Sequence, residues 1–232
     1  EVVNKYGSDI LRYYMCEISA GENINFNWDD VKIKQRNLGI LWNLHRYLID
    51  LKKEIKNPLK TRFDLEEEWI LSLKNSTVKK VNELLESYRI DESISEIENL
   101  FLEFSRSYIQ MTREKEKVFP VVNEVFQDIL KMFSIISPFI TEAIWQELRK
   151  PLELKDESVH LCSFPKVDEK AINKKLEGEF EIAKQIIEKG MAERDKAKIG
   201  LKWPLAKAEI TVVKDFDKKL LPVLERQLNL KK

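Results

Sequence analysis

The chain has 232 residues, of which 43% are hydrophobic and 34% are charged, and its 40 basic residues are balanced by 40 acidic ones. This neutrality excludes a protein that binds polyanions through overall positive charge, so any nucleic-acid binding has to come from local clusters of cations. Only 6 Gly and 7 Pro accompany abundant Lys, Glu, Leu and Ile, a composition that favours long helices with few loops.

Helical periodicity and capping residues divide the chain into a series of predicted helices. The predicted helices cover residues 10–18, 29–56, 64–88, 91–111, 120–137, 141–148, 171–198 and 216–228. Their expected caps are Ser8 with Asp9, Asn27 or Asp29, the capping-box pair Asp64 and Glu67, and Asp91. A polar connector is expected over residues 21–27.

The least polar long segment, residues 121–148, is expected to be the centre around which other helices pack. Ser137-Pro138 interrupts it, because proline lacks the N–H that a helix interior needs and disfavours helical geometry in the residue before it. We therefore expect one helix to end or kink near Ser137 and another to start at about Thr141, with Glu142 in its first turn.

The cleanest apolar spacing in the chain alternates steps of three and four residues, which predicts a buried helical seam. Its members are Ile94, Ile97, Phe101, Phe104, Tyr108 and Met111. Apolar stripes also place Trp42, Trp69 and Trp145 in the core, together with Tyr88 at the end of the stripe over 64–88.

Beyond Pro151 the pattern changes, with an irregular stretch over 153–168 that resembles a domain boundary. A long helix over 171–198 follows, and Gly200 is expected to stop it. Residues 208–213 (AEITVV) are rich in β-branched side chains and predict a strand, and Leu230 suggests the start of another. The fold class is therefore mainly α, an antiparallel helical bundle with a small, truncated α+β C-terminal piece.

No self-contained active site or metal site is visible, so no catalytic and no metal-binding residue is predicted. His45 and His160 have no Cys, Asp or His at ligand spacing, and a surface or packing role is expected for both. Cys16 and Cys162 lie far apart, which argues against a disulfide framework or a zinc site and favours a reducing, cytoplasmic location. No apolar run approaches the ~20 residues that span a membrane, so no membrane contact is expected.

Two basic clusters are candidates for binding a nucleic acid. One consists of Lys189, Arg194, Lys196, Lys198, Lys202 and Lys207 around Trp203, and the other of Arg106, Arg113, Lys115 and Lys117 with Tyr108 and Gln110. Cations hold a sugar-phosphate backbone, while aromatic and amide groups stack on splayed bases or hydrogen-bond to them. The alternative for each cluster is a solvated helix face, and Tyr108 belongs to the apolar seam.

Several short strings together resemble class I aminoacyl-tRNA synthetases of the isoleucyl, valyl and leucyl group. Residues 1–14 (EVVNKYGSDILRYY) look like the segment after the KMSKS loop of that group, and 41–43 resemble its LWN string. Further similar strings are WILS at 69–72, FSRSYIQMTR at 104–113, SPFITE at 137–142 with Trp145, SVHL at 158–161 and FP at 164–165. LKWPL at 201–205 and QLNL at 227–230 favour the isoleucyl branch.

The resemblance implies a connector after a catalytic domain (1–28), a helical-bundle anticodon-binding domain (29–165), and a long helix with the start of an α+β C-terminal domain (166–232). It implies a piece of a longer polypeptide, which fits a sequence that begins with Glu1. The HIGH and KMSKS motifs that handle ATP chemistry are not in this sequence. We therefore expect no cofactor here, ATP and Mg being bound by the parent's catalytic domain, and no activity from this chain alone.

On this resemblance the expected function is binding of the anticodon stem and loop of a tRNA, which would be isoleucine tRNA. The expected tRNA-binding residues are Arg106, Gln110, Arg113, Lys115, Lys117, Arg194, Lys196, Lys198, Lys202 and Trp203. The expected partners are tRNA and the catalytic domain of the same parent chain. Two alternatives stay open: the same region of a valyl or leucyl enzyme, and, from another class, a helical scaffold that binds a protein.

Overall fold

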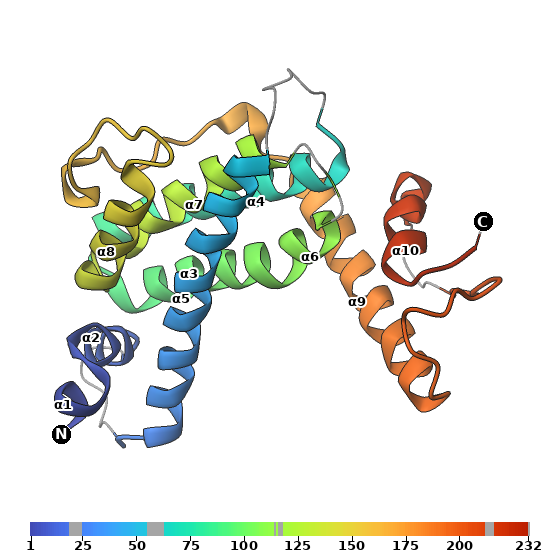
Figure 1. Ribbon diagram of the computed structural model, residues 1–232, viewed down its shortest axis with the longest axis horizontal. Coiled ribbons are helices and arrows are strands. Elements are labelled where there is room, and N and C mark those ends of the chain that lie inside the picture. Colours follow the sequence, from blue (N-terminus) through green and yellow to red (C-terminus); the bar gives the residue numbers. More distant parts are fainter. Residues whose placement is uncertain (19–24, 55–62, 114, 116–117, 212–215, 232) are drawn as a thin grey trace.

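The structure, a computed structural model, describes residues 1–18, 25–54, 63–113, 115, 118–211 and 216–231. Within them the main elements are α1 (Val2–Tyr6), α2 (Ser8–Cys16), α3 (Trp28–Glu54), α4 (Leu65–Glu86), α5 (Ile90–Glu103), α6 (Ile109–Thr112), α7 (Phe119–Phe133), α8 (Pro138–Arg149), α9 (Lys174–Lys196) and α10 (Leu221–Gln227). Helices α2 to α8 form a bundle, and α9 leads away from it toward α10 and the C-terminus (Figure 1). The prediction of a mainly helical bundle is confirmed. No described helix is both long and apolar enough to pass through a membrane.

The apolar segment 121–148 forms the centre of the bundle, as predicted. Helix α7 contacts α3, α4, α5 and α8, and its apolar face is buried from Val121 to Phe133. The predicted break is also present, but α7 ends at Phe133 and α8 begins at Pro138 rather than near Thr141. The difference arises because proline fits the first turn of a helix, where its missing N–H needs no partner.

Asp9 has a different role from the predicted one. Its carboxylate accepts the backbone N–H groups of Phe139 and Ile140 at 3.4 and 2.6 Å, so α2 supplies the cap of α8. Helix α2 itself begins after Gly7, without a side-chain cap. Because the capped helix lies about 130 residues away in sequence, no local pattern predicts this contact.

The other predicted caps are mostly confirmed. The side-chain oxygen of Asn27 accepts the N–H of Asp29 at 2.9 Å and caps α3. Asp64 and Glu67 form both halves of the capping box at α4. The exception is Asp91, which lies inside the first turn of α5 and is not its N-cap residue.

The predicted seam is buried at every position from Ile94 to Met111. It runs through one π turn, Phe104–Tyr108, which joins α5 to α6 without ending the helix. Trp69 of α4 is also buried and stacks on Phe180 of α9, with 4.6 Å between ring centroids and 4° between planes. This stack attaches α9 to the bundle.

Two predicted core aromatics are not buried. Trp42 is 38% exposed and meets His45 edge-on, and Tyr88 is 90% exposed. Helix α4 ends at Glu86, and Tyr88 adopts a left-handed conformation with φ 59° that turns its side chain away from the stripe. His45 itself is buried, and burial lowers its pKa. The predicted end of the long helix near Lys56 lies outside the described residues.

Helix α9 ends at Lys196, and the prediction that Gly200 stops it is wrong. The stop is a Schellman motif, in which Lys198 takes the left-handed conformation with φ 56°. The N–H of Lys198 donates to the carbonyl of Asp195 and that of Ile199 to the carbonyl of Arg194, both at 2.9 Å. A lysine therefore occupies the position where glycine is usual.

The predicted α+β character of the C-terminal piece is mostly wrong. Residues 208–211 have no regular structure, and Val212 and Val213 lie outside the described residues. The described part contains one parallel bridge, Leu205 to Leu230, in which the N–H of Lys231 donates to the carbonyl of Leu205 at 2.7 Å. One bridge is too short for a sheet, so residues 197–211 and 216–231, here called the C-terminal lobe, are held by other contacts.

Candidate nucleic-acid interface

A groove of about 370 Å³ lies between the π turn with α6 on one side and α9 on the other. Arg106 and Gln110, both predicted tRNA contacts, line it from the first side. Lys184 and Gln185 line it from α9, and Gln227 lines it from α10. The fold thus adds three residues, two of them glutamines, to two residues that the sequence singled out.

The cations in this groove differ in their availability. The Lys184 ammonium lies 2.8 Å from Glu103 and 2.7 Å from Glu181, so its charge is already compensated. Arg106 is exposed and has no carboxylate partner among the described residues. It projects from a π turn, an irregularity that is frequent at functional sites.

Arg113, at the end of α6, is likewise exposed and forms no ion pair within the described part of the chain. Lys117, another predicted contact, lies outside the described residues. Arg106, Gln110 and Arg113 therefore form an exposed strip along one helical segment. Its free guanidinium groups suit phosphate oxygens, which arginine binds in a planar, forked geometry.

Lys115 differs from its neighbours because its ammonium contacts a cluster of acidic residues at the start of α4. It lies 2.9 Å from Asp64 and 3.2 Å from both Glu66 and Glu67, whose carboxylates are buried. Burial opposes its charge, but the hydrogen bond to Asp64 and the charges of the glutamates outweigh this and raise the Lys115 pKa. The carboxylate oxygens of these three residues lie close enough together to bind a cation between them. The ammonium group of Lys115 takes the position of that cation. Lys115 is thus committed to the fold rather than available for tRNA.

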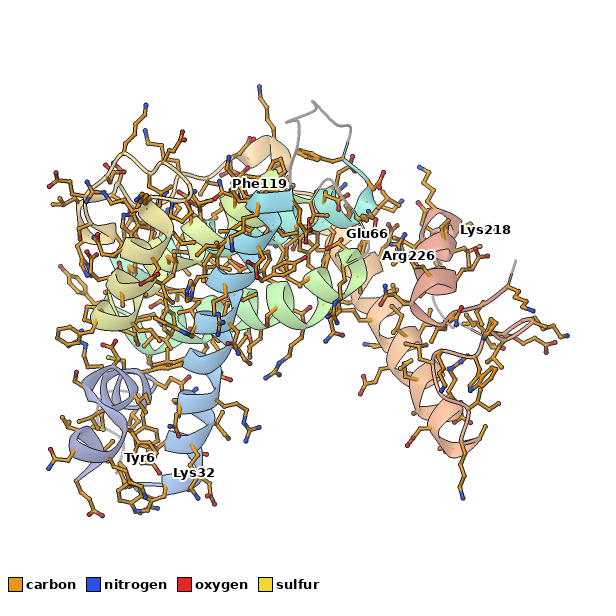
Figure 2. All side chains as sticks on the ribbon, viewed as in Figure 1. Tyr6, Lys32, Glu66, Phe119, Lys218 and Arg226 are labelled. Atoms are coloured by element: carbon orange, nitrogen blue, oxygen red, sulfur yellow. The ribbon has the colours of Figure 1, made fainter. Side chains whose placement is uncertain are left out.

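The same cluster joins the bundle to the C-terminal lobe. Arg226 of α10 forms an ion pair with Glu66 of α4, and the two side chains face each other in Figure 2. The next residue, Gln227, donates weakly to the carbonyl of Met111 at 3.5 Å. Together with the attachment of α9 to α4, these contacts fix the position of α10 relative to α6.

Arg194 was predicted to contact tRNA, but its guanidinium is used inside the protein. Its side chain is 5% exposed and donates to the carbonyls of Leu228 at 3.1 Å, Gly200 at 2.9 Å and Trp203. These carbonyls belong to the turn after α9 and to the end of α10. Arg194 therefore organises the C-terminal lobe and has no free face for an RNA phosphate.

The remaining members of that cluster are at the surface. Lys196 pairs with Glu193 one turn back at 2.6 Å, whereas Lys198 and Lys202 are exposed without a carboxylate partner among the described residues. Trp203 is 62% exposed, with the Lys202 ammonium 5.6 Å from its ring centre. The lobe thus presents an exposed indole beside two free cations, the combination that stacks a base and holds its phosphate.

Comparison with known proteins identifies the family. The sequence pattern of the anticodon-binding domain of tRNA ligases matches residues 67–210. The chain belongs to this family. Its whole length is 34% identical to part of the isoleucine–tRNA ligases of Pyrococcus abyssi and Thermococcus kodakarensis, and 30% identical to part of that of Sulfolobus acidocaldarius. The chain spans about 24% of the length of these relatives.

The anticodon-binding-domain match includes both long walls of the groove, residues 103–111 and 181–188. The residues that sequence reasoning missed are Lys184 and Gln185 on α9 and the pair Arg226 and Gln227 on α10. In the sequence, a glutamine or arginine on a polar helix face that lines a binding groove looks the same as one that only faces solvent. Only the approach of α9 and α10 to α6 shows that these side chains share a groove.

Proposed function

We propose that this chain is the tRNA-binding part of an isoleucyl-tRNA synthetase and that it holds the anticodon stem and loop of isoleucine tRNA. The parent enzyme would attach isoleucine to that tRNA, with ATP and Mg²⁺ bound by its catalytic domain. The observation that carries the proposal is the match to the anticodon-binding domain of tRNA ligases, which spans both walls of the groove.

The distribution of charge supports this role. A chain with 40 basic and 40 acidic residues has no general attraction for RNA, so the free cations decide where RNA lies. Arg106 and Arg113 are exposed at the π turn and α6, and Lys198 and Lys202 are exposed in the C-terminal lobe beside Trp203. These two groups of cations belong to the two regions that the α9 attachment and the Arg226 ion pair hold together.

The packing supports a rigid rather than an adaptable binding surface. The Trp69 to Phe180 stack and the Arg226 to Glu66 ion pair join the bundle to α9 and α10 at separate points. Two attachment points fix the orientation of α9 and α10 relative to the bundle, which a single attachment point would leave free to rotate. A fixed surface reduces the entropy lost when an RNA binds.

The test is tRNA binding by the Arg113→Ala/Lys198→Ala double variant, measured as a function of salt. We expect the affinity to fall about five- to thirtyfold, since two exposed charge contacts are each worth up to about 1 kcal/mol. The slope of log affinity against log salt should fall by roughly 0.7 for each lost phosphate contact.

The matched control is Lys150→Ala/Lys155→Ala, which removes the same charge at the end of α8 and in the loop after it, at the opposite end of the molecule from α10 (Figure 1). Equal effects of the two double variants would mean that binding follows net charge, and would contradict the proposed surface. Equal affinity of the wild-type chain for isoleucine and valine tRNAs would overturn the isoleucine assignment.

A further inference from the structure

Three glutamine side chains from three helices meet in the groove: Gln110 of α6, Gln185 of α9 and Gln227 of α10. Gln110 and Gln185 are exposed and have no hydrogen-bond partner among the described residues. Gln227 is half-buried and makes one long contact, 3.5 Å to the carbonyl of Met111. Each amide carries both donors and an acceptor, so the groove has unused hydrogen-bonding capacity on several sides.

The charge of the groove argues against a phosphate as its occupant. Three carboxylates, Glu103, Glu181 and Glu188, line it against two cations, Arg106 and Lys184. Lys184 is already paired with two of those carboxylates. A phosphate inside the groove would meet a net negative environment, whereas a neutral group with polar edges would not.

The groove also has an apolar side. Met111, which is buried, and Ile187 of α9, which is half-buried, both line the groove. A methionine thioether packs well against aromatic rings. With a volume of about 370 Å³, the groove is at the small end of the range of ligand pockets.

We propose that this groove receives one unstacked base of the bound tRNA and that Gln185 and Gln227, with Gln110, read its edge. The inference rests on the proposed tRNA-binding function and assigns it a base-reading site. The base lies against Met111 and Ile187, and its flanking phosphates lie outside the groove on the free cations. Single-stranded RNA loops are recognised in this way, by stacking and by hydrogen bonds to splayed bases.

The acidic lining adds hydrogen-bond acceptors to the groove. A carboxylate accepts a hydrogen bond from an exocyclic amino group, as it does from cytosine, and cannot donate one to a carbonyl. Glu188 is exposed and forms no ion pair within the described part of the chain. Glu188 can therefore accept a hydrogen bond from an exocyclic amino group or a ring N–H of the base, while the glutamine amides supply donors for its carbonyl oxygens or ring nitrogens.

The test uses the complete 232-residue chain and a synthetic anticodon stem–loop of isoleucine tRNA, with each loop nucleotide in turn replaced by an abasic one. We expect Gln185→Ala/Gln227→Ala to weaken binding of the unmodified stem–loop about tenfold, the effect of losing one bidentate base contact. At one loop position the abasic replacement should weaken binding by the wild type but not by the variant.

Gln35→Ala is the matched control, because Gln35 is an exposed glutamine on α3, outside this groove, and should leave the whole binding profile unchanged. Replacing Gln227 could move α10, because Gln227 contacts the carbonyl of Met111. The single variant Gln185→Ala avoids this effect, since Gln185 makes no hydrogen bond within the described fold. The inference is overturned if Gln185→Ala and Gln185→Ala/Gln227→Ala both bind the stem–loop as tightly as the wild type does. It is also overturned if every abasic replacement weakens binding by these variants as much as it weakens binding by the wild type. If the wild type binds neither the stem–loop nor whole tRNA, the proposed function fails, and this inference with it.

Discussion

The burial of Arg194 leads to a prediction that separates a structural role from an RNA contact. Its guanidinium holds the carbonyls of Gly200 and Trp203, just after α9, and that of Leu228, at the end of α10. Replacement by methionine keeps an unbranched apolar stem of similar length but removes every donor. We expect Arg194→Met to release the C-terminal lobe from α9 while the bundle stays folded.

The magnitude follows from the two best-defined contacts, at 3.1 Å to Leu228 and 2.9 Å to Gly200. Hydrogen bonds to a charged group are worth about 1.5–3 kcal/mol each, which gives about 3–6 kcal/mol for the pair. Part of this is offset, because the buried guanidinium costs several kcal/mol to desolvate and its Nε has no hydrogen-bond partner among the described residues. We expect a net loss of about 2–4 kcal/mol in the local stability of the lobe.

Hydrogen–deuterium exchange is the assay, because it reports local opening separately from global unfolding. Arg194→Met should accelerate exchange in α10 by roughly 30- to 1,000-fold, which corresponds to about 2–4 kcal/mol, and leave α7 unchanged. Lys196→Met, two residues further on at the surface, should change neither. The reasoning is refuted if Arg194→Met leaves α10 protected and instead weakens tRNA binding with a smaller salt slope.

Two further predictions concern the joint between the N-terminal helices and the bundle. Asp9→Ala removes the cap that α2 supplies to α8; a lost cap costs up to about 2 kcal/mol, so the melting temperature should fall by about 4–8 °C. The Lys34 ammonium contacts the carboxyl groups of both Glu17 and Glu98. Burial and the hydrogen bond with Glu98 raise the pKa of Glu17 to about 7. The folded state therefore keeps this proton up to a higher pH than the unfolded state, so the contribution of Glu17 to the free energy of unfolding should fall as pH rises from about 4.5 to about 7. Burial lowers the pKa of His45 and contributes in the opposite direction, so the test is the difference between Glu17→Gln and the wild type: the variant should lack the Glu17 decline.

Calorimetry across this pH range tests both variants. Asp9→Asn keeps an acceptor oxygen for α8 and should recover most of the loss, and an Asp9→Ala variant that melts with the wild type would contradict the capping role. A Glu17→Gln chain whose stability varies with pH as that of the wild type does would contradict the role given to Glu17.

Much of the bundle was predictable because its determinants are local. Periodicity places Ile94 to Met111 in one seam, and Ser137-Pro138 breaks the central segment, since the geometry of proline acts within its own turn. The failures occur where a residue's environment is set by a distant one. Asp9 caps a different helix from its own, and Trp42 is exposed although its spacing follows an apolar stripe.

The candidate site shows the same division. The sequence by itself determined that the chain is mainly helical, that its resemblance is to anticodon-binding domains, and that Arg106, Gln110 and Arg113 belong to one basic cluster. Only the tertiary structure decided that Arg194 and Lys115 are committed to the fold, and that Gln185 and Gln227 belong beside Gln110. The reason is physical: the spacing along a helix fixes which face a side chain occupies, but its partners depend on which other helices pack against that face.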